Sequence, residues 1–183
     1  MINIPNGKVT FLFTDIEGST KLSQNFPEIL SEILAKHNSI LNEAVESHNG
    51  FVFKMIGDAF CCSFQNAEDA IKAAVDAQIK LHTEKWNDAV IKVRMGIHSG
   101  NTEWSGTDYM GYITLARANR VMSSAYGEQI LMSDDSYRMT EGYINESISF
   151  RDLGERRLKD LIQPVKLFQI VSIFLQQFFH FRP

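Results

Sequence analysis

Two aspartates stand where apolar segments of the chain run into turns. Asp15 ends an apolar segment that starts at Val9, and Asp58 belongs to the turn Gly57-Asp58 after another such segment. If the two segments are neighbouring strands, both carboxylates meet at one sheet edge and can hold a pair of divalent ions. Two such ions can activate an attacking hydroxyl and stabilise the charge on a leaving phosphate. Taken singly, each acid also fits an ordinary turn residue.

The residues after Asp15 suit a phosphate. Gly18 permits a tight turn, and Ser19-Thr20 have the pattern of a helix start. Free amides at the start of a helix can bind an anion. An acid next to an anion site makes sense when a divalent cation joins them, because Mg²⁺ is usually held by one or two carboxylates together with substrate phosphates.

The strands and helices that position these residues follow from the hydrophobic spacing. The predicted strands cover residues 9–15, 51–56, 59–64, 90–98, 129–133, 147–153 and 167–172. The predicted helices cover residues 28–47, 67–79 and 111–125. We expect Gly57-Asp58 to close a hairpin and Ser99-Gly100 to end a strand in a turn. Strands mixed with helices, several of them joined by hairpins, indicate an α+β fold in which helices cover a mainly antiparallel sheet.

Length and composition limit the class of protein. A chain of 183 residues is one domain, or one domain with a tail. The net charge of −4 argues against a nucleic-acid binder with a broad basic face. Cys61 and Cys62 are adjacent in an apolar run, which excludes a disulfide framework and predicts buried thiols. The sequence shows no signal peptide and no apolar run long enough to span a membrane, so we expect a cytoplasmic protein.

Five motifs follow one another along the chain. They are Phe13-Thr14-Asp15-Ile16-Glu17-Gly18-Ser19-Thr20, Ile56-Gly57-Asp58-Ala59-Phe60, Arg94-Met95-Gly96-Ile97-His98-Ser99-Gly100, Asp108-Tyr109-Met110-Gly111, and Arg151-Asp152-Leu153-Gly154 with Arg157-Leu158-Lys159-Asp160-Leu161. In this order they resemble the catalytic domain of class III nucleotidyl (adenylate/guanylate) cyclases of bacterial type. The resemblance implies a ferredoxin-like βαββαβ core, extended by C-terminal strands, that works as a homodimer with active sites shared at the interface. The implied reaction converts a nucleoside triphosphate to the 3′,5′-cyclic monophosphate and pyrophosphate.

The resemblance also assigns the metal and phosphate groups. Asp15 and Asp58 resemble the ligands of two divalent ions, Mg²⁺ or Mn²⁺, with the Ile16 carbonyl as a further ligand. The loop under the β- and γ-phosphates corresponds to Glu17, Gly18, Ser19 and Thr20. Arg120 resembles the arginine that stabilises the transition state, and Lys159 the lysine that reaches the triphosphate from the partner subunit.

Two further positions concern the base. Lys54 precedes Asp58 by four residues, and Asp108 precedes Gly111 by three, which are the base-reading positions of the family. A Lys and Asp pair there resembles the combination that selects adenine. The chemistry fits, since an ammonium can donate to adenine N1 and a carboxylate can accept from its amino group.

The chain departs from the family pattern in the helix that carries Arg120. Most active relatives have an asparagine four residues before this arginine, where it orients the ribose, and this chain has Ala116. The spacing from Asp108 to Arg120 is also one residue longer than usual. Side chains that could substitute are Thr114, Arg117 and Asn119. A slower cyclase, a pyrimidine (UTP or CTP) cyclase of bacterial phage defence and a nucleotide-sensing domain without turnover all stay open, and we expect an active adenylate cyclase.

The catalytic domain is expected to cover residues 1–171, followed by a tail at residues 172–183. This tail is either a linker to a further module or a dimer contact. Exposed Phe178, Phe179 and Phe181 are unfavourable unless they are covered, so we expect them to pack at a dimer contact or on the sheet.

Overall fold

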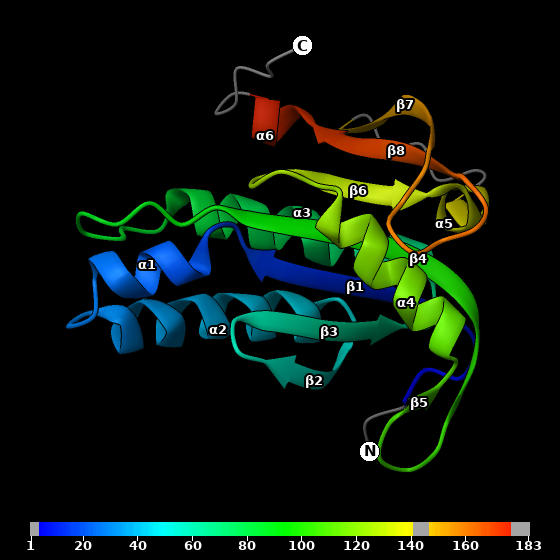
Figure 1. The fold of residues 1–183 in the computed structure, drawn as a ribbon, viewed down its shortest axis with the longest axis horizontal. Coiled ribbons are helices and arrows are strands. Elements are labelled where there is room, and N and C mark those ends of the chain that lie inside the picture. Colours follow the sequence, from blue (N-terminus) through cyan, green and yellow to red (C-terminus); the bar gives the residue numbers. More distant parts are fainter. Residues whose placement is uncertain (1–3, 141–146, 177–183) are drawn as a thin grey trace.

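The computed structural model describes residues 4–140 and 147–176. Its strands are β1 (Gly7–Ile16), β2 (Phe51–Ile56), β3 (Ala59–Phe64), β4 (Val93–Trp104), β5 (Tyr109–Met110), β6 (Ile130–Ser133), β7 (Ile148–Arg156) and β8 (Val165–Ser172). Its helices are α1 (Ser19–Asn25), α2 (Leu30–Ser47), α3 (Ala67–Thr83), α4 (Tyr112–Ser123), α5 (Asp134–Tyr137) and α6 (Ile173–Gln176), with the 3-10 turn η1 (Arg138–Thr140). The strands form one sheet with helices on both faces (Figure 1).

The first part of the chain forms the predicted βαββαβ core. β1 lies between β3 and β4 and is antiparallel to both, and β2 pairs with β3 in a hairpin. The resulting strand order is β2-β3-β1-β4, which continues through β6, β8 and β7. Only the β4–β6 pairing in this sheet is parallel, among the strands that the structure describes, and α4 makes the crossover between them. The ferredoxin-like core with added C-terminal strands is therefore confirmed.

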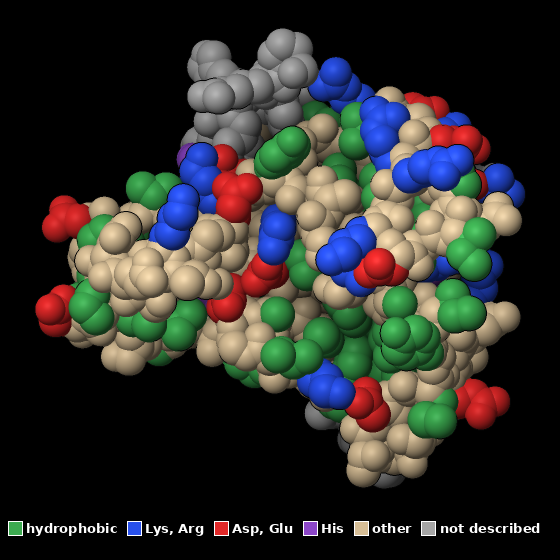
Figure 2. All heavy atoms as spheres, in the orientation of Figure 1, with side chains coloured by type: hydrophobic (Ala, Val, Ile, Leu, Met, Phe, Trp, Pro, Cys, Tyr) green, Lys and Arg blue, Asp and Glu red, His purple; other side chains and the backbone are tan. Residues whose placement is uncertain are grey.

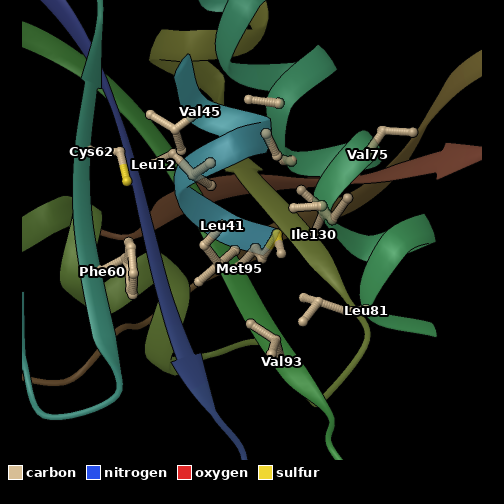
Figure 3. Close-up of a cluster of buried hydrophobic side chains, with 14 of the residues drawn as sticks. Leu12, Leu41, Val45, Phe60, Cys62, Val75, Leu81, Val93, Met95 and Ile130 are labelled. Atoms are coloured by element: carbon tan, nitrogen blue, oxygen red, sulfur yellow. The ribbon is translucent and has the colours of Figure 1, made fainter. Parts of the chain in front are cut away.

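One face of the sheet packs against α2 and α3. Even-numbered residues of β1, such as Leu12 and Ile16, join Phe60 and Met95 in a large apolar core on this side (Figure 3). Asn66 caps α3 by accepting a hydrogen bond from the Asp69 amide, as expected for a residue that opens a helix. Because side chains alternate along a strand, Leu12 and Ile16 of β1 lie on the α2 and α3 side, and the odd-numbered residues of β1 lie on the other side.

The other face of the sheet is crossed by α4, which lies in front of the strands in Figure 1. Two glycines of β4 permit this close approach. A Cβ added at Gly96 would lie 2.2 Å from the backbone nitrogen of Met122, and one at Gly100 would lie 2.7 Å from the Thr114 side chain. The helix therefore rests directly on the strand backbone.

The turn predicted at Ser99-Gly100 is wrong. β4 continues without interruption to Trp104, and Gly100 pairs with Val9 of β1 inside the ladder. The glycine serves the close packing of α4 rather than a change of chain direction. The helix expected from residue 28 begins at Leu30, and the predicted strand at residues 90–98 begins only at Val93.

The C-terminal region extends the sheet and then leaves it. β8 pairs with β6 and β7, and α6 follows directly. The predicted packing of Phe178, Phe179 and Phe181 lies outside the described residues. The domain boundary at residue 171 stays a prediction.

Candidate active site

Asp15 and Asp58 lie side by side at one edge of the sheet. Asp15 is the last but one residue of β1, and Asp58 stands in the β2–β3 turn, where its carboxylate accepts a hydrogen bond of 2.9 Å from the Ile16 amide. Burial raises the pKa of the Asp15 carboxyl, the Arg94 guanidinium opposes this rise, and the neighbouring Asp58 carboxylate raises it further. Two carboxylates that approach this closely disfavour each other's charge, and a divalent cation between them would remove that repulsion.

Arg94 is a member of the site to which the sequence assigned no role. It pairs with Asp15 in the β1–β4 register, and its Nε donates to the Asp15 carboxylate at 3.0 Å while a second guanidinium nitrogen contacts the same oxygen. This ion pair compensates part of the Asp15 charge. A cation that binds Asp15 has to compete with the guanidinium for that oxygen. One indication of this role was present in the sequence, because Arg94 opens the third of the five motifs. Its ion-pair partner could not be foreseen, since that depends on the register between β1 and β4.

Lys54 and Asp108 meet on the α4 face of the sheet. A β-bulge between Val52 and Lys54 places Lys54 opposite Cys61, whose side chain lies in the apolar cluster below α4. The Lys54 Nζ donates to the Asp108 carboxylate at 2.5 Å. Each partner stabilises the charge of the other, so the pKa of Lys54 is raised and the pKa of Asp108 is lowered. With exposed fractions of 47% and 41%, both charges are accessible to a ligand.

An aromatic cluster packs against the backbone that carries this charged pair. Tyr109 follows Asp108 and packs edge-on against Phe11 and Phe53, with ring centroids 5.0 and 4.9 Å apart. Its hydroxyl donates to the Pro5 carbonyl at 2.7 Å, and its amide donates to the Asp108 carboxylate. Burial raises the pKa of the nearby Cys61 thiol to about 11, so this residue stays a neutral part of the floor.

Arg120 lies on the partly exposed side of α4 and forms an ion pair with Asp160. The guanidinium Nη2 donates to the Asp160 carboxylate at 2.5 Å. Asp160 and Lys159 are the central residues of a turn closed by a hydrogen bond from the Leu161 amide to the Leu158 carbonyl. Lys159 itself is exposed and has no ion-pair partner among residues 4–140 and 147–176.

The predicted phosphate loop is fixed by Glu17. Its amide donates to the Lys92 carbonyl at 2.8 Å, and its carboxylate accepts from the Gly127 amide at 3.0 Å. The Glu17 side chain therefore points to the turn before β6 and acts as a brace for the loop. Gly18 has a positive φ of 73°, as expected for a tight turn, and α1 begins directly after it.

Ala116, which stands where most active relatives have an asparagine, places only a small side chain on α4, and several of its neighbours on the helix are exposed. Among the candidates for substitution, Asn119 is exposed, Thr114 donates to the Asn101 carbonyl, and Arg117 approaches Asp135 at 3.8 Å. His98, the histidine of the third motif, is buried inside β4 and shares a hydrogen bond of 2.8 Å with the Ser133 hydroxyl. Burial lowers the pKa of His98 to about 4, which identifies it as a neutral core residue.

The sequence profile described as the adenylate and guanylate cyclase catalytic domain matches residues 3–172. The chain belongs to this family. Among curated proteins, an uncharacterized protein of Mycobacterium tuberculosis is 31% identical over 168 residues, which are 91% of this chain and 56% of that protein. An adenylate cyclase of Neurospora crassa is 31% identical over 186 residues, which cover 85% of this chain and 8% of that protein. The chain thus spans just over half of the mycobacterial relative.

Solved structures of cyclases share the fold. An adenylate cyclase of Trypanosoma brucei in its monomeric state superposes with a TM-score of 0.82 at 23% identity, over 92% of this chain and 91% of that one. An adenylyl cyclase of P. aeruginosa gives a TM-score of 0.74 at 24% identity, over 91% of this chain and 94% of that one. At these identities the likeness establishes the architecture.

The residues that the structure describes contain neither a membrane-spanning helix nor a cluster of metal-binding side chains. No helix within residues 4–140 and 147–176 has the length and apolar character needed to cross a membrane. The same residues contain no group of three or more His, Cys, Asp and Glu side chains arranged for a metal ion. The acidic pair Asp15 and Asp58 still fits Mg²⁺ or Mn²⁺, because such ions take one or two carboxylates and complete their shell with substrate phosphates and water.

Proposed function

We propose that this domain is a nucleotidyl cyclase that converts ATP to 3′,5′-cyclic AMP and pyrophosphate at the interface of a homodimer. The observation that carries the proposal is the accessible Lys54–Asp108 pair on the same face of the sheet as Asp15. The paired acids supply the metal ligands, and the ion pair supplies one donor and one acceptor for a base. Membership of the cyclase family supports the reaction class.

Each part of the site has a chemical task in this reaction. Asp15 and Asp58, with the Ile16 carbonyl, would hold two divalent ions, which when bound lower the pKa of the 3′-hydroxyl and neutralise charge on the triphosphate. The 3′-hydroxyl loses its proton to water and its oxygen forms a bond to the α-phosphorus. The bond from that phosphorus to the bridging oxygen breaks, and pyrophosphate leaves with the electron pair. Arg120 donates to the phosphoryl oxygens as charge develops, and Lys159 binds the triphosphate. The loop Glu17, Gly18, Ser19 and Thr20 lies under the outer phosphates.

Base selection is assigned to Lys54 and Asp108. To read adenine, the Lys54 ammonium turns from Asp108 to the acceptor N1, and Asp108 accepts from the exocyclic amino group. Since both side chains of the ion pair are exposed to solvent, opening it costs little free energy. Guanine presents a donor at N1 and a carbonyl at position 6, which reverses the required pattern.

A second copy of the chain is the expected partner. Large apolar side chains are exposed around the site on the β2–β3 hairpin, β5 and the start of α4: Met55, Ile56, Met110, Tyr112 and Ile113. Figure 2 shows hydrophobic side chains on this face near α4, among acidic and basic ones. An apolar surface of this kind next to charged groups is typical of an interface. The chain's cytoplasmic location and its independence of nucleic acid are part of the same proposal.

The test is product identification with each triphosphate. The purified protein is incubated with Mn²⁺ and ATP, GTP, CTP or UTP, and products are identified by mass spectrometry. Cyclic AMP from ATP is the expected result. A cyclic pyrimidine would keep the reaction and overturn the base assignment. Triphosphate binding without product would favour the nucleotide-sensing function that Ala116 suggests, and an increase of Tm by Mn²⁺ would still report the acidic pair.

A further inference from the structure

The turn that carries Lys159 is attached to α4 by apolar contacts on both sides of its tip. Leu158 is buried and Leu161 is partly buried, and both pack in a cluster with Val121 and Ala125 of the helix region. The Leu161 amide closes the turn on the Leu158 carbonyl at 3.2 Å. Lys159 and Asp160 are therefore presented together at the tip, next to the side of α4 that carries Arg120.

The backbone of Asp160 is unusual for a residue with a side chain. Its φ is +61°, a left-handed conformation in which glycine is the least strained choice at such a turn position. An exposed ion pair such as Arg120–Asp160 also contributes little to stability. Aspartate is one of the few residues besides glycine that adopt this conformation readily, so the turn tolerates Asp160 but makes no use of its carboxylate. The carboxylate instead accepts a hydrogen bond from Arg120.

The contact with Arg120 leaves that arginine able to bind phosphate. A guanidinium has five N–H donors, and the hydrogen bond to Asp160 uses one nitrogen, Nη2, at 2.5 Å. The remaining donors are available to a phosphoryl group while Asp160 fixes the side chain. Lys159, one residue before Asp160, has no ion-pair partner among the described residues and stays available for the same anion.

We propose that Asp160 is a positioning residue that holds Arg120 and the Lys159 turn together as one triphosphate-binding unit. This inference rests on the proposed function, since it says how the two basic side chains of that site, Arg120 and Lys159, are held in position. Asp160 acts through Arg120 and does not itself contact the nucleotide. Removal of its carboxylate lets the long Arg120 side chain sample other rotamers, and misplaced catalytic charge is costly in rate.

The test compares three single variants. Asp160→Gly removes the carboxylate and suits the left-handed backbone, Asp160→Asn keeps a similar shape, and Asp152→Asn removes a charge from another exposed ion pair, with Lys166 at 2.9 Å. We expect kcat to fall about tenfold in both Asp160 variants with a smaller change of KM. The Tm should be unchanged or higher in Asp160→Gly, and Asp152→Asn should behave as wild type. Higher kcat in the Asp160 variants would overturn the proposal, because it would mark Asp160 as a brake on Arg120.

A binding cycle separates this inference from the reaction itself. The loss of affinity for α,β-methylene ATP with Mn²⁺ caused by Arg120→Ala is measured by calorimetry in the wild type and in Asp160→Gly. We expect the loss to be severalfold smaller in Asp160→Gly, because Arg120 is already misplaced there. If the two affinity losses differ but no cyclic product forms, the cyclase is refuted and the positioning role of Asp160 is kept. If cyclic product forms but the two affinity losses are equal, the cyclase is kept and the positioning role is refuted. A wild type that does not bind the triphosphate would refute both.

Discussion

The face of the sheet that packs on α2 and α3 differs from the face crossed by α4. The first is filled with apolar side chains, and its buried polar atoms include the Thr14 hydroxyl and His37 Nε2, which have no hydrogen-bond partner among the described residues. The second carries ion pairs along its rim, Asp15–Arg94, Lys54–Asp108 and Arg120–Asp160. Alternation along the same strands supplies both faces. The charged groups of the proposed chemistry therefore lie at the rim of the face crossed by α4, and side chains on the opposite face can be changed without touching them.

The largest effect is expected at Asp58, where turnover should be lost while thermal stability is kept. Replacement by Asn keeps an oxygen that can accept from the Ile16 amide but removes the charge that holds a cation. If cation-assisted charge stabilisation of several kcal/mol is lost, turnover should fall about 10³-fold with little change of Tm. Product formation and thermal unfolding are measured in parallel, with Asp76→Asn on α3 as the control. Residual activity above a tenth of wild type would remove Asp58 from the metal site.

Phe60, two residues further along β3, should show the opposite behaviour. Its side chain is fully buried on the α2 and α3 face and packs edge-on against His37 at 5.7 Å. Phe60→Ala should lower the free energy of unfolding by about 3–5 kcal/mol because it leaves a cavity in a packed core. Urea unfolding gives the value, and triphosphate affinity at low temperature should be retained. A loss below about 1 kcal/mol would mean that this core is loosely packed.

Gly96 tests the contact between α4 and β4. A methyl group there meets the backbone of Met122, which cannot move without moving the helix, so Gly96→Ala should cost about 2–3 kcal/mol. At Gly100 the obstacle is only the Thr114 side chain. Gly100→Ala should therefore be milder and should be partly rescued by Thr114→Ala. Urea unfolding of the three variants decides this, and equal costs at the two glycines would contradict the packing described.

The smallest effect concerns pH and His98. Because burial lowers the pKa of His98 to about 4, protonation favours the unfolded chain once the pH falls below the ordinary value of 6.5. This residue should lower the free energy of unfolding by about 2 kcal/mol between pH 7.5 and pH 5. The same measurement on His98→Asn, which can keep a hydrogen bond to Ser133, should give a shallower dependence. An identical slope in both proteins would show that other groups dominate.

Several features of the fold and the site were predictable because they are local. The Gly57-Asp58 hairpin and the apolar strand that leads to Asp15 each depend on a few adjacent residues, and both are observed. The Ser99-Gly100 turn failed for a physical reason. A glycine in a strand pattern can mark a turn or the close approach of another element, and the sequence does not distinguish between them until α4 is placed.

The sequence by itself determined which chemical groups the protein has and how the strands alternate, since side-chain periodicity and turn chemistry act over short distances. Only the tertiary structure decided which charges meet. Arg94 reaches Asp15 through strand register, a bulge before Lys54 directs it toward Asp108, and packing of Leu158 and Leu161 brings Asp160 to Arg120. Such contacts join residues far apart in the chain, because the burial of apolar surface sets the relative positions of whole elements and the charges follow.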